Sequence, residues 1–377
     1  MTLEQIIAAH KIVICAGSGG VGKTTTAASI AVLAASQGRR VVVMTIDPAK
    51  RLANALGLQS LGGSLVEVPL DDEGHNLSAM MLDQKGAWDE LVDRHAPSPE
   101  VRDRILENHF YQNLSQTFAG SQEYMAIEQL CELYDRGQFD LIVVDTPPTR
   151  HALDFLEAPQ RLADFLDRNV VKWFVRPYFS AGWSTMRFVN RTAGFLFKRL
   201  EDATGVSALV EVSEFFTAMS SLFEGFEPRV RRVYELLRSP ETAFVLVASP
   251  EEQVLREAEF FTSKVAELGM ALRAVVFNRV HWEARSARRR GKEKLDVRAL
   301  LANRDIAAPL AEALAVNFDR YEAIGRGDAL RMEAFRNALP QSVVVLEVPN
   351  FNTDIHSVEG LKAMHPFLRG RHDTRQQ

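Results

Sequence analysis

Short apolar runs alternate along the chain with longer segments of helical periodicity. The runs are rich in Val and Ile and are apolar at consecutive positions, as strands covered by helices on both faces must be. They lie at residues 11–16, 41–46, 141–144, 244–248, 274–277 and 343–348, with a weaker candidate at 77–82. Helical patterns lie between several of them, for example at 24–36 and 251–268. This alternation predicts an α/β fold with a doubly wound, mainly parallel sheet.

Two long stretches interrupt the alternation. Residues 84–136 and 151–239 show helical periodicity and few strand signals. A crossover between parallel strands needs only about a dozen residues, so stretches of this length are more than connections. We therefore expect one domain formed by residues 1–150 and 240–368, with a smaller helical part at 84–136. Residues 151–239 are expected to be an α-helical insertion, and the polar tail 369–377 to be flexible.

Phenylalanine is concentrated in the expected insertion. The chain has 22 Phe against 6 Tyr and 4 Trp, and eleven of the 22 Phe lie between residues 155 and 226. Several of them lie off the apolar stripes of the predicted helices. A helix with more than one apolar face either packs in a core or offers a surface to something hydrophobic. Ordinary packing in a helical bundle and a surface for a hydrophobic partner therefore both remain open.

Composition and charge exclude several classes of protein. The 377 residues carry 44 Lys and Arg against 49 Asp and Glu, a net charge of −5, which argues against a general nucleic-acid binder. Two cysteines, Cys15 and Cys131, are too few for a disulfide framework or a tetrahedral zinc site. The N-terminus lacks a basic region, and no run of about 18 apolar residues is free of charge. We therefore expect a cytoplasmic protein with neither a signal peptide nor a transmembrane segment.

A glycine-rich loop follows the first predicted strand. Residues 17–24, GSGGVGKT, fit the pattern G-x-x-x-x-G-K-[ST] and open a predicted helix, which is the context that the pattern requires. Backbone N–H groups of such a loop cradle phosphates, Lys23 places its charge between the terminal phosphates, and the Thr24 hydroxyl binds Mg²⁺. The predicted nucleotide-binding residues of the loop are Gly19, Gly20, Val21, Gly22, Lys23, Thr24 and Thr25. The sequence therefore predicts a P-loop NTPase.

Two aspartates end predicted strands of this sheet, at the edge where ligands bind. Asp47, in TIDPA, could orient or deprotonate the water that attacks the γ-phosphate, and Lys23 would assist as the second catalytic residue. The alternative is that Asp47 caps a helix that starts near Ala49. Asp145 follows the run LIVV, a usual place for a carboxylate near Mg²⁺, often through water. Its alternative is an ordinary residue at the end of a strand.

Five motifs occur in order along the chain: GSGGVGKTT, TIDPAKRL, DTPPTRHALDFL, VFNRV and VPNF. In this combination the chain resembles the arsenical-pump and guided-entry ATPase family, whose members are dimeric P-loop ATPases of the deviant-Walker type. The resemblance covers essentially the whole chain and implies ATP and Mg²⁺ as cofactors. It implies that Asp47 is the hydrolytic switch carboxylate. Asp145, together with Thr149 and His151, is implied to form the second switch, which couples the γ-phosphate to the insertion.

The resemblance also implies which residues bind the adenine base, and at one position of the loop the chain differs from the family pattern. It implies that Asn278 reads the adenine and that Pro349 packs on the base. The family normally carries a signature Lys just after the first glycine of the loop, which reaches the phosphates of the partner subunit, whereas this chain has Ser18. A hydroxyl cannot supply that unit charge to the opposite site. We therefore expect slow hydrolysis as a homodimer, or a heterodimer with a paralogue that brings the missing Lys.

Three functions follow from the resemblance. The first is a Mg²⁺-dependent dimeric ATPase of the targeting or chaperone type, whose helical subdomain opens and closes around a hydrophobic helical client. The second is a regulatory or scaffold ATPase that acts with a paralogous subunit. An arsenite-efflux motor is a distant third, because As(III) needs three soft thiolates and neither cysteine lies in a cluster.

Two further segments bear on metals and partners. The eukaryotic members of the family share a zinc ion across the dimer through a Cys pair, and the equivalent residues 281–290 contain no Cys, so we do not expect zinc between subunits. The basic run 285–294 is either a solvated surface or a contact for a membrane-associated or acidic partner.

Overall fold

The chain divides into two compact units in the computed structural model. The structure describes residues 2–47, 49–70, 76–109, 111–112, 115, 121–148, 226–282, 297–302, 304 and 306–370. Unit 1 comprises Met1–Met81, Arg136–Leu153 and Arg238–Gln377, and unit 2 comprises Leu82–Asp135 and Asp154–Leu237. The sequence assigned 84–136 to the first domain, whereas this division groups most of that segment with the insertion. Residues 151–225 of the expected insertion lie outside the described part.

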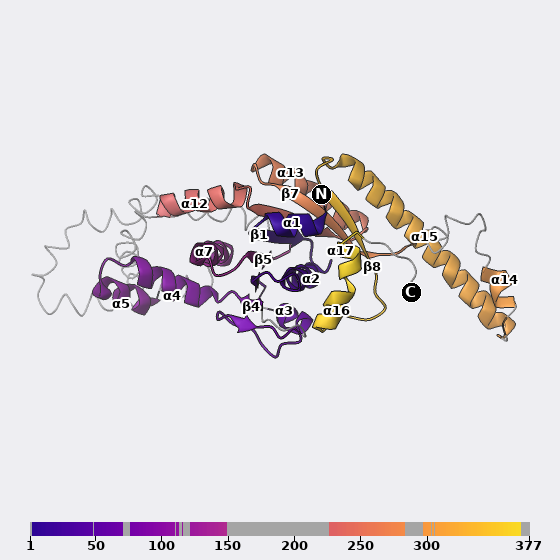
Figure 1. The fold of residues 1–377 in the computed structure, drawn as a ribbon, viewed down its shortest axis with the longest axis horizontal. Helices are drawn as coiled ribbons and strands as arrows, with labels where there is room; N and C mark the ends of the chain where they lie inside the picture. The colour runs from indigo at the N-terminus through magenta and orange to yellow at the C-terminus, as the bar shows by residue number, and fades with distance from the viewer. Residues whose placement is uncertain are drawn as a thin grey trace, which may run out of the picture. The chain divides into compact units, whose positions relative to one another are not determined.

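Unit 1 is built on a sheet whose strands come from distant parts of the chain (Figure 1). The strands are β1 (Ile12–Gly17), β2 (Val41–Thr45), β3 (Val66–Glu67), β4 (Leu77–Met81), β5 (Leu141–Asp145), β6 (Thr242–Ala248), β7 (Leu272–Val280) and β8 (Val344–Pro349). Among the described residues their order is β3-β4-β2-β5-β1-β6-β7-β8. Only β3 and β4 pair in antiparallel fashion; the other neighbours are parallel. The predicted doubly wound, mainly parallel sheet is confirmed.

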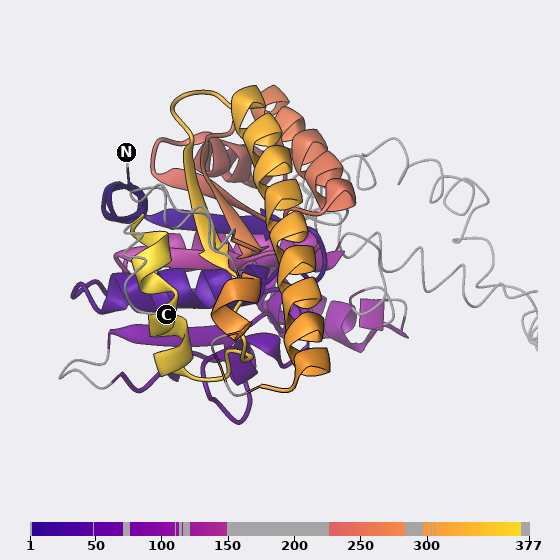
Figure 2. The same ribbon diagram turned by 90° about the vertical axis from the view of Figure 1, so that its right-hand side faces the viewer.

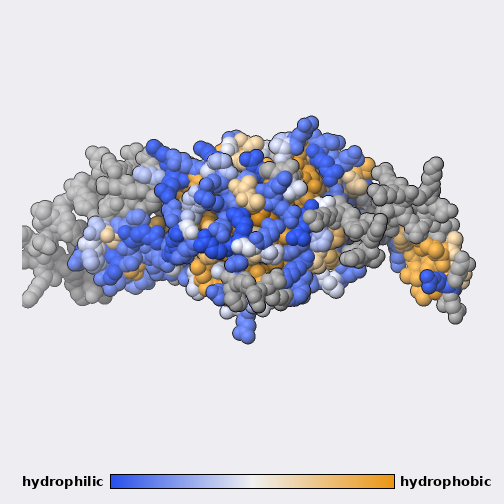
Figure 3. All heavy atoms as spheres, viewed as in Figure 1, coloured by the Kyte–Doolittle hydropathy of each residue, from blue (hydrophilic) through white to orange (hydrophobic). Residues whose placement is uncertain are grey.

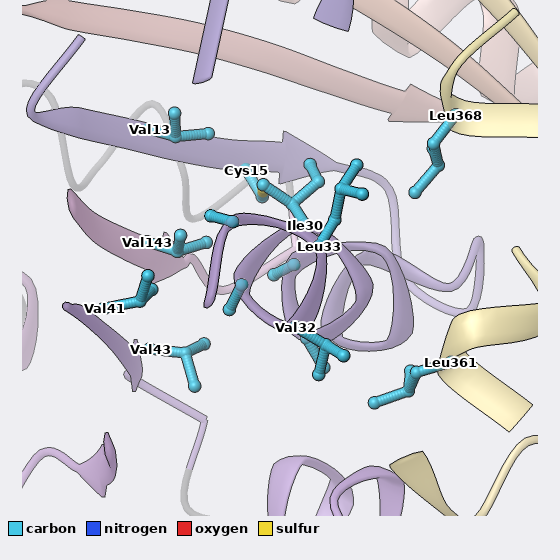
Figure 4. Packing of buried hydrophobic residues seen from close by; sticks show 14 of the residues in the cluster. Val13, Cys15, Ile30, Val32, Leu33, Val41, Val43, Val143, Leu361 and Leu368 are labelled. Carbon is cyan, nitrogen blue, oxygen red and sulfur yellow. The ribbon is translucent and has the colours of Figure 1, made fainter. Parts of the chain in front are cut away.

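One face of the sheet is covered by the helix that follows the glycine loop. The helices on this face are α1 (Leu3–Ala9), α2 (Lys23–Ala35), α3 (Arg51–Ala55), α16 (Val358–Ala363) and α17 (His365–Leu368). Most residues of α2 are buried, and its Ile30 and Leu33 pack toward Val13 and Cys15 of β1 (Figure 4). A run of Ala and other small residues lets α2 approach the strands closely. The sheet and α2 together fix the start of α2, where the glycine loop ends.

Two further helices lie on the other side of the sheet, α13 (Glu252–Glu267) and α15 (Ala308–Ala338) (Figure 2). Phe277 of β7 meets Phe335 of α15 edge to face, with ring centroids 5.7 Å apart. A short helix, α14 (Val297–Ala302), packs on the N-terminal half of α15 through ion pairs from Arg298 to Glu312 and Asp319. Neither α1 nor α15 was predicted from the sequence. In α15, Gly325 and Gly327 interrupt the helical pattern.

The apolar stripe of α15 is covered along only part of the helix. Met332 and Phe335, near its C-terminal end, are buried, whereas Leu310, Leu314 and Ile324 are 55%, 42% and 48% exposed. Figure 3 shows apolar side chains at the end of unit 1 that α14 and the start of α15 form. None of the helices in the described ranges is long and apolar enough to cross a bilayer.

Unit 2 is helical in its described part. Its helices are α4 (Gln84–His95), α5 (Pro99–Glu107), α7 (Ser121–Arg136, of which the last residue falls in unit 1) and α12 (Phe226–Arg238, which likewise ends on a residue of unit 1). Asp83 caps α4 by accepting a bond from the Gly86 amide at 3.0 Å, and Ser98 caps α5. Arg94 of α4 pairs with Glu132 of α7 at 3.1 Å. The helical character predicted for 84–136 is therefore present in its described residues.

Acid is expected to destabilise unit 1 through His365, which lies at the start of α17 with 7% of its surface exposed. Burial, with smaller effects of the Arg369 and Lys362 charges, lowers the pKa of His365 from 6.5 to about 4. The unfolded chain takes up a proton at this group below pH 6.5, whereas the folded chain does not until about pH 4. The contribution of this group to the free energy of unfolding should therefore fall by roughly 3 kcal/mol as the pH falls through this window. Urea unfolding of the parent protein and of His365→Gln at pH 7 and pH 4.5 tests this, because other groups titrate alike in both proteins and the parent should lose more stability than the variant.

Candidate functional site

The glycine loop joins the end of β1 to the start of α2. Gly17 of β1 is paired with Val247 of β6, so the loop leaves the sheet from its central strands. Gly20 and Gly22 have φ angles of 80° and 90°, in the left-handed region that favours glycine. Gly22 is the N-cap of α2, and the helix therefore begins at Lys23 with its first N–H groups directed toward the loop. This is the backbone arrangement that binds phosphate at the start of a helix.

Asn278, near the end of β7, is hydrogen-bonded to the glycine loop. Its side-chain amide donates a hydrogen bond to the Val21 carbonyl oxygen at 2.8 Å. A Cβ at position 22 would lie 2.2 Å from the Asn278 Nδ2 atom, and the left-handed φ of 90° also favours glycine there. The predicted loop residue Gly22 and the predicted base-reading residue Asn278, separated by 256 positions, are thus in direct proximity.

Lys23 is held inside the loop. Its side chain is 7% exposed, and its Nζ atom donates to the Ser18 carbonyl oxygen at 3.2 Å. Burial lowers the pKa of Lys23, and the negative charge of Asp145 opposes that effect. The ammonium is therefore desolvated in advance, which strengthens its interaction with any anion that enters the loop.

Asp145 is the centre of a buried polar cluster at the end of β5. Its Oδ2 atom accepts hydrogen bonds from the Thr24 hydroxyl at 2.8 Å and from the Thr45 hydroxyl at 2.9 Å. Burial raises the pKa of Asp145 to about 6, although both hydroxyls and the charge of Lys23 act in the opposite direction. Thr45 is a member of this cluster that the sequence analysis did not single out. Thr45 opens the motif TIDPAKRL, but a threonine at the end of a strand gives no signal by itself.

The cluster fits a magnesium ion. The Oδ1 atom of Asp145 is buried and has no hydrogen-bond partner in the described part of the chain. An unpaired carboxylate oxygen in such a place is costly unless a cation or its water occupies the space beside it. The Thr24 hydroxyl and the Asp145 carboxylate are the oxygen ligands that Mg²⁺ takes at nucleotide sites, directly or through water. When bound, the ion neutralises phosphate charge.

Asp47 lies just past the end of β2. Its Oδ1 atom accepts a bond from the Ala49 amide at 2.9 Å, and its Oδ2 atom pairs with Arg51 at 3.3 Å. The first contact is a local turn, and the N-cap of α3 is Lys50 without a side-chain bond, so Asp47 does not cap that helix. Asp47 also raises the pKa of Asp145, which indicates that the two carboxylates are close enough to interact. The carboxylate is partly exposed and remains available to a water molecule.

A pocket of about 480 Å³, which includes open solvent, lies beside the loop. It is lined by Gly22, Thr25, Asn278, Arg279, Pro349, Asn350, Phe351, Thr353, Asp354, Ile355 and Met364. Asn278 and Pro349, the two residues predicted to contact the base, therefore share this pocket with the loop. Such a lining, partly apolar with a few convergent polar groups, suits a planar ring. Thr149 and His151, the remaining predicted switch residues, lie outside the described residues.

An ionic network centred on the buried carboxylate of Asp328 lies at the end of β7. Asp328 of α15 accepts bonds from the His281 backbone amide at 3.1 Å and from Arg331 at 2.7 Å. Arg331 also donates to the Pro250 carbonyl oxygen at 2.6 Å. The network ties the end of β7 and the loop after β6 to α15. No local pattern in the sequence predicts contacts between elements so far apart, so this network was not predicted.

Replacing Asn278 with alanine is expected to weaken ATP binding about tenfold and to reduce the preference for ATP over GTP. The lost bond to Val21 alone could weaken both nucleotides, so the ratio of the two affinities is the decisive quantity. Titration with fluorescent ATP and GTP analogues measures it. Asn337→Ala, at an exposed position of α15, is the control. An unchanged ratio would show that Asn278 does not read the base.

Comparison with known proteins agrees with this geometry. The sequence model of the anion-transporting ATPase family matches residues 10–299. The chain is 28% identical to ATPase GET3 of Malassezia globosa over 74% of this chain and 76% of that protein. It is 25% identical to the putative arsenical pump-driving ATPase 1 of Aquifex aeolicus over 72% of this chain and 63% of that protein. It is 26% identical to ATPase get3 of Neurospora crassa over 74% of this chain and 76% of that protein.

The family model covers more than half of the chain, and its match includes the glycine loop, Asp47, Asp145 and Asn278. Of the residues that the motifs singled out, Thr24 is bonded to Asp145, and Gly22, Asn278 and Pro349 line one pocket. This chain belongs to the anion-transporting ATPase family of GET3 and the arsenical pump-driving ATPases, and it is an ATP hydrolase that uses ATP with Mg²⁺.

Proposed function

We propose that this ATPase works as a dimer of the targeting or chaperone type, in which the phosphate state of the nucleotide opens and closes a helical subdomain around a hydrophobic helical client. Lys23 and the loop amides hold the phosphates, and Asp47 orients the attacking water. Asn278 and Pro349 hold the base. The dimer and the client come from the resemblance to the guided-entry ATPases.

One observation carries the proposal. Asp145 is bonded to Thr24 at the predicted magnesium site and lies at the end of β5. From there the chain continues through Thr149 and His151 and passes from unit 1 into unit 2 between Leu153 and Asp154. A change at the phosphate site therefore has a short covalent path to the helical unit. Order and movement of such a segment in response to a γ-phosphate is a common switching device.

The experiment measures whether the purified protein prevents aggregation of a synthetic apolar helix of about 20 residues, which serves as the client. Protection is expected to differ between the ATP-bound and ADP-bound protein and to fall on the double change Phe188→Ser and Phe195→Ser. Phe260→Ser is the control, because Phe260 is an exposed aromatic residue of α13, 58% accessible and outside the insertion. Absence of protection in both nucleotide states would reject the client-binding function.

A regulatory ATPase that acts with a paralogous subunit is the second candidate, and Ser18 supports it. Its side chain is engaged within its own subunit, where it donates to Glu257 at 2.7 Å. It supplies no positive charge to a second active site. Co-purification from native cells distinguishes the two candidates, because a fully active homodimer is incompatible with a required paralogue.

Arsenite pumping has the least support. Both cysteines are free and buried, Cys15 in unit 1 and Cys131 in unit 2. Burial raises the pKa of Cys15 far above its usual range and that of Cys131 to about 12. As(III) binds thiolates, and neither cysteine forms one at neutral pH.

A further inference from the structure

Ser18 links the phosphate loop to α13 through a single side chain. Its hydroxyl donates to the Glu257 Oε2 atom at 2.7 Å, and its carbonyl oxygen accepts from the Lys23 ammonium at 3.2 Å. Ser18 is 6% exposed, whereas Glu257 is partly exposed. Hydrogen bonds to a charged group are among the stronger ones in proteins.

The fold explains why a residue of α13 reaches the loop. β6 is the neighbour of β1, and its Val247 is paired with Gly17 at the base of the loop. α13 begins five residues later, at Glu252, and buries Leu255, Ala258 and Phe261. Glu257 lies at the edge of that buried face, where it is partly exposed. Its carboxylate is thus held next to the first residues of the loop by the packing of α13.

We propose that Glu257 is a positioning residue of the ATP site, which fixes the Ser18 peptide and thereby the first turn of the phosphate loop. The proposal rests on ATP binding at this loop. It gives Ser18 a role inside its own subunit, at the position where the family carries a Lys that acts on a partner. The Ser18 carbonyl that holds Lys23 can keep its direction only if the rest of the residue is held, and Glu257 holds it.

The effect of Glu257 is one of geometry more than of charge. Asp145, Arg51 and Asp47 are among the charged groups that act on the pKa of Lys23. Glu257 reaches the loop through its hydrogen bond to the Ser18 hydroxyl. A neutral acceptor of the same shape should serve as well, which separates this role from simple electrostatic repulsion or attraction of the nucleotide.

The test is titration with a fluorescent ATP analogue together with steady-state ATPase kinetics on the full chain. Ser18→Ala and Glu257→Ala should each weaken nucleotide binding and raise KM about tenfold, with kcat at saturating ATP changed less than about threefold. The double variant should be no weaker than either single variant, because both remove the same bond. Glu257→Gln should bind within about twofold of the parent protein, since its amide oxygen still accepts from Ser18.

Glu259→Ala is the matched control, because Glu259 lies on the same helix but is exposed. Thermal unfolding confirms that each variant is folded before it is titrated. If Glu257→Ala and Ser18→Ala bind like Glu259→Ala, or if Glu257→Gln is as weak as Glu257→Ala, the positioning role is wrong. If the parent protein itself binds no nucleotide, the ATP site is wrong. If the protein binds ATP as described but does not protect the client from aggregation, the proposed targeting function is wrong and the role of Glu257 is unaffected.

Discussion

The change Asp47→Asn is expected to lower ATP turnover by about 100-fold or more while ATP still binds and the protein remains folded. The asparagine side-chain oxygen can still accept from the Ala49 amide, which is the local bond that Asp47 makes at 2.9 Å. The amide cannot take a proton from water or orient it as strongly as a carboxylate. The substitution therefore keeps this local bond, although it loses the charge that pairs with Arg51 at 3.3 Å, and it removes the chemistry.

Single-turnover hydrolysis and a binding titration separate the two effects. Asp83→Asn is the matched control, because Asp83 makes a similar local bond, to the Gly86 amide, at a helix start in unit 2. That variant should turn over ATP like the parent protein. If Asp47→Asn instead hydrolyses ATP normally, then Asp47 is only a turn residue and the water must be activated by another group.

The change Asp145→Asn is expected to lower ATP turnover about 10- to 100-fold and to weaken the dependence of turnover on Mg²⁺. The amide oxygen of asparagine can accept from Thr24 and Thr45 as the Oδ2 atom of Asp145 does. The Oδ1 atom, however, is replaced by an amide that cannot face a cation or accept from its water. The nucleotide-free protein should lose little stability, because a buried carboxylate with one unpaired oxygen is removed.

The response of the Asp145→Asn variant to Mg²⁺ is measured by titrating magnesium while following ATPase activity and the ATP-induced rise in Tm. Asp140→Asn is the control, since Asp140 immediately precedes the same strand but is exposed and paired with Arg40 at 2.7 Å. Its turnover should match that of the parent protein. An Asp145→Asn variant with an unchanged magnesium dependence would remove Asp145 from the metal site.

The sheet and the phosphate loop could be predicted because their signals are local. Continuous apolar runs located the central strands, and the residues around Lys23 carry their pattern within eight positions. Asn278 could be assigned only through the resemblance, since a polar residue near a strand end is otherwise uninformative. Its side-chain amide donates to the Val21 carbonyl oxygen, a contact between residues 257 positions apart that no local pattern predicts.

What escaped prediction depends on contacts between distant residues. Glu257 lies in the middle of a helix and is chemically like any solvated glutamate, and only the pairing of β6 with β1 brings it to Ser18. Thr45 was unremarkable until β2 was placed beside β5, which puts its hydroxyl on Asp145. In both cases the order of the strands in the sheet carries information that no segment of the sequence contains.

The burial of both cysteines makes this protein a convenient host for site-directed labels. Cys15 and Cys131 have raised pKa values and are shielded from reagents, so thiol-specific dyes should leave the native chain unmodified. Cysteines introduced at exposed positions such as Glu259 of α13 and Glu107 of α5 would then be the reactive ones, one in each unit. Energy transfer between two such dyes converts the proposed opening and closing into a distance that can be followed through a single ATP cycle.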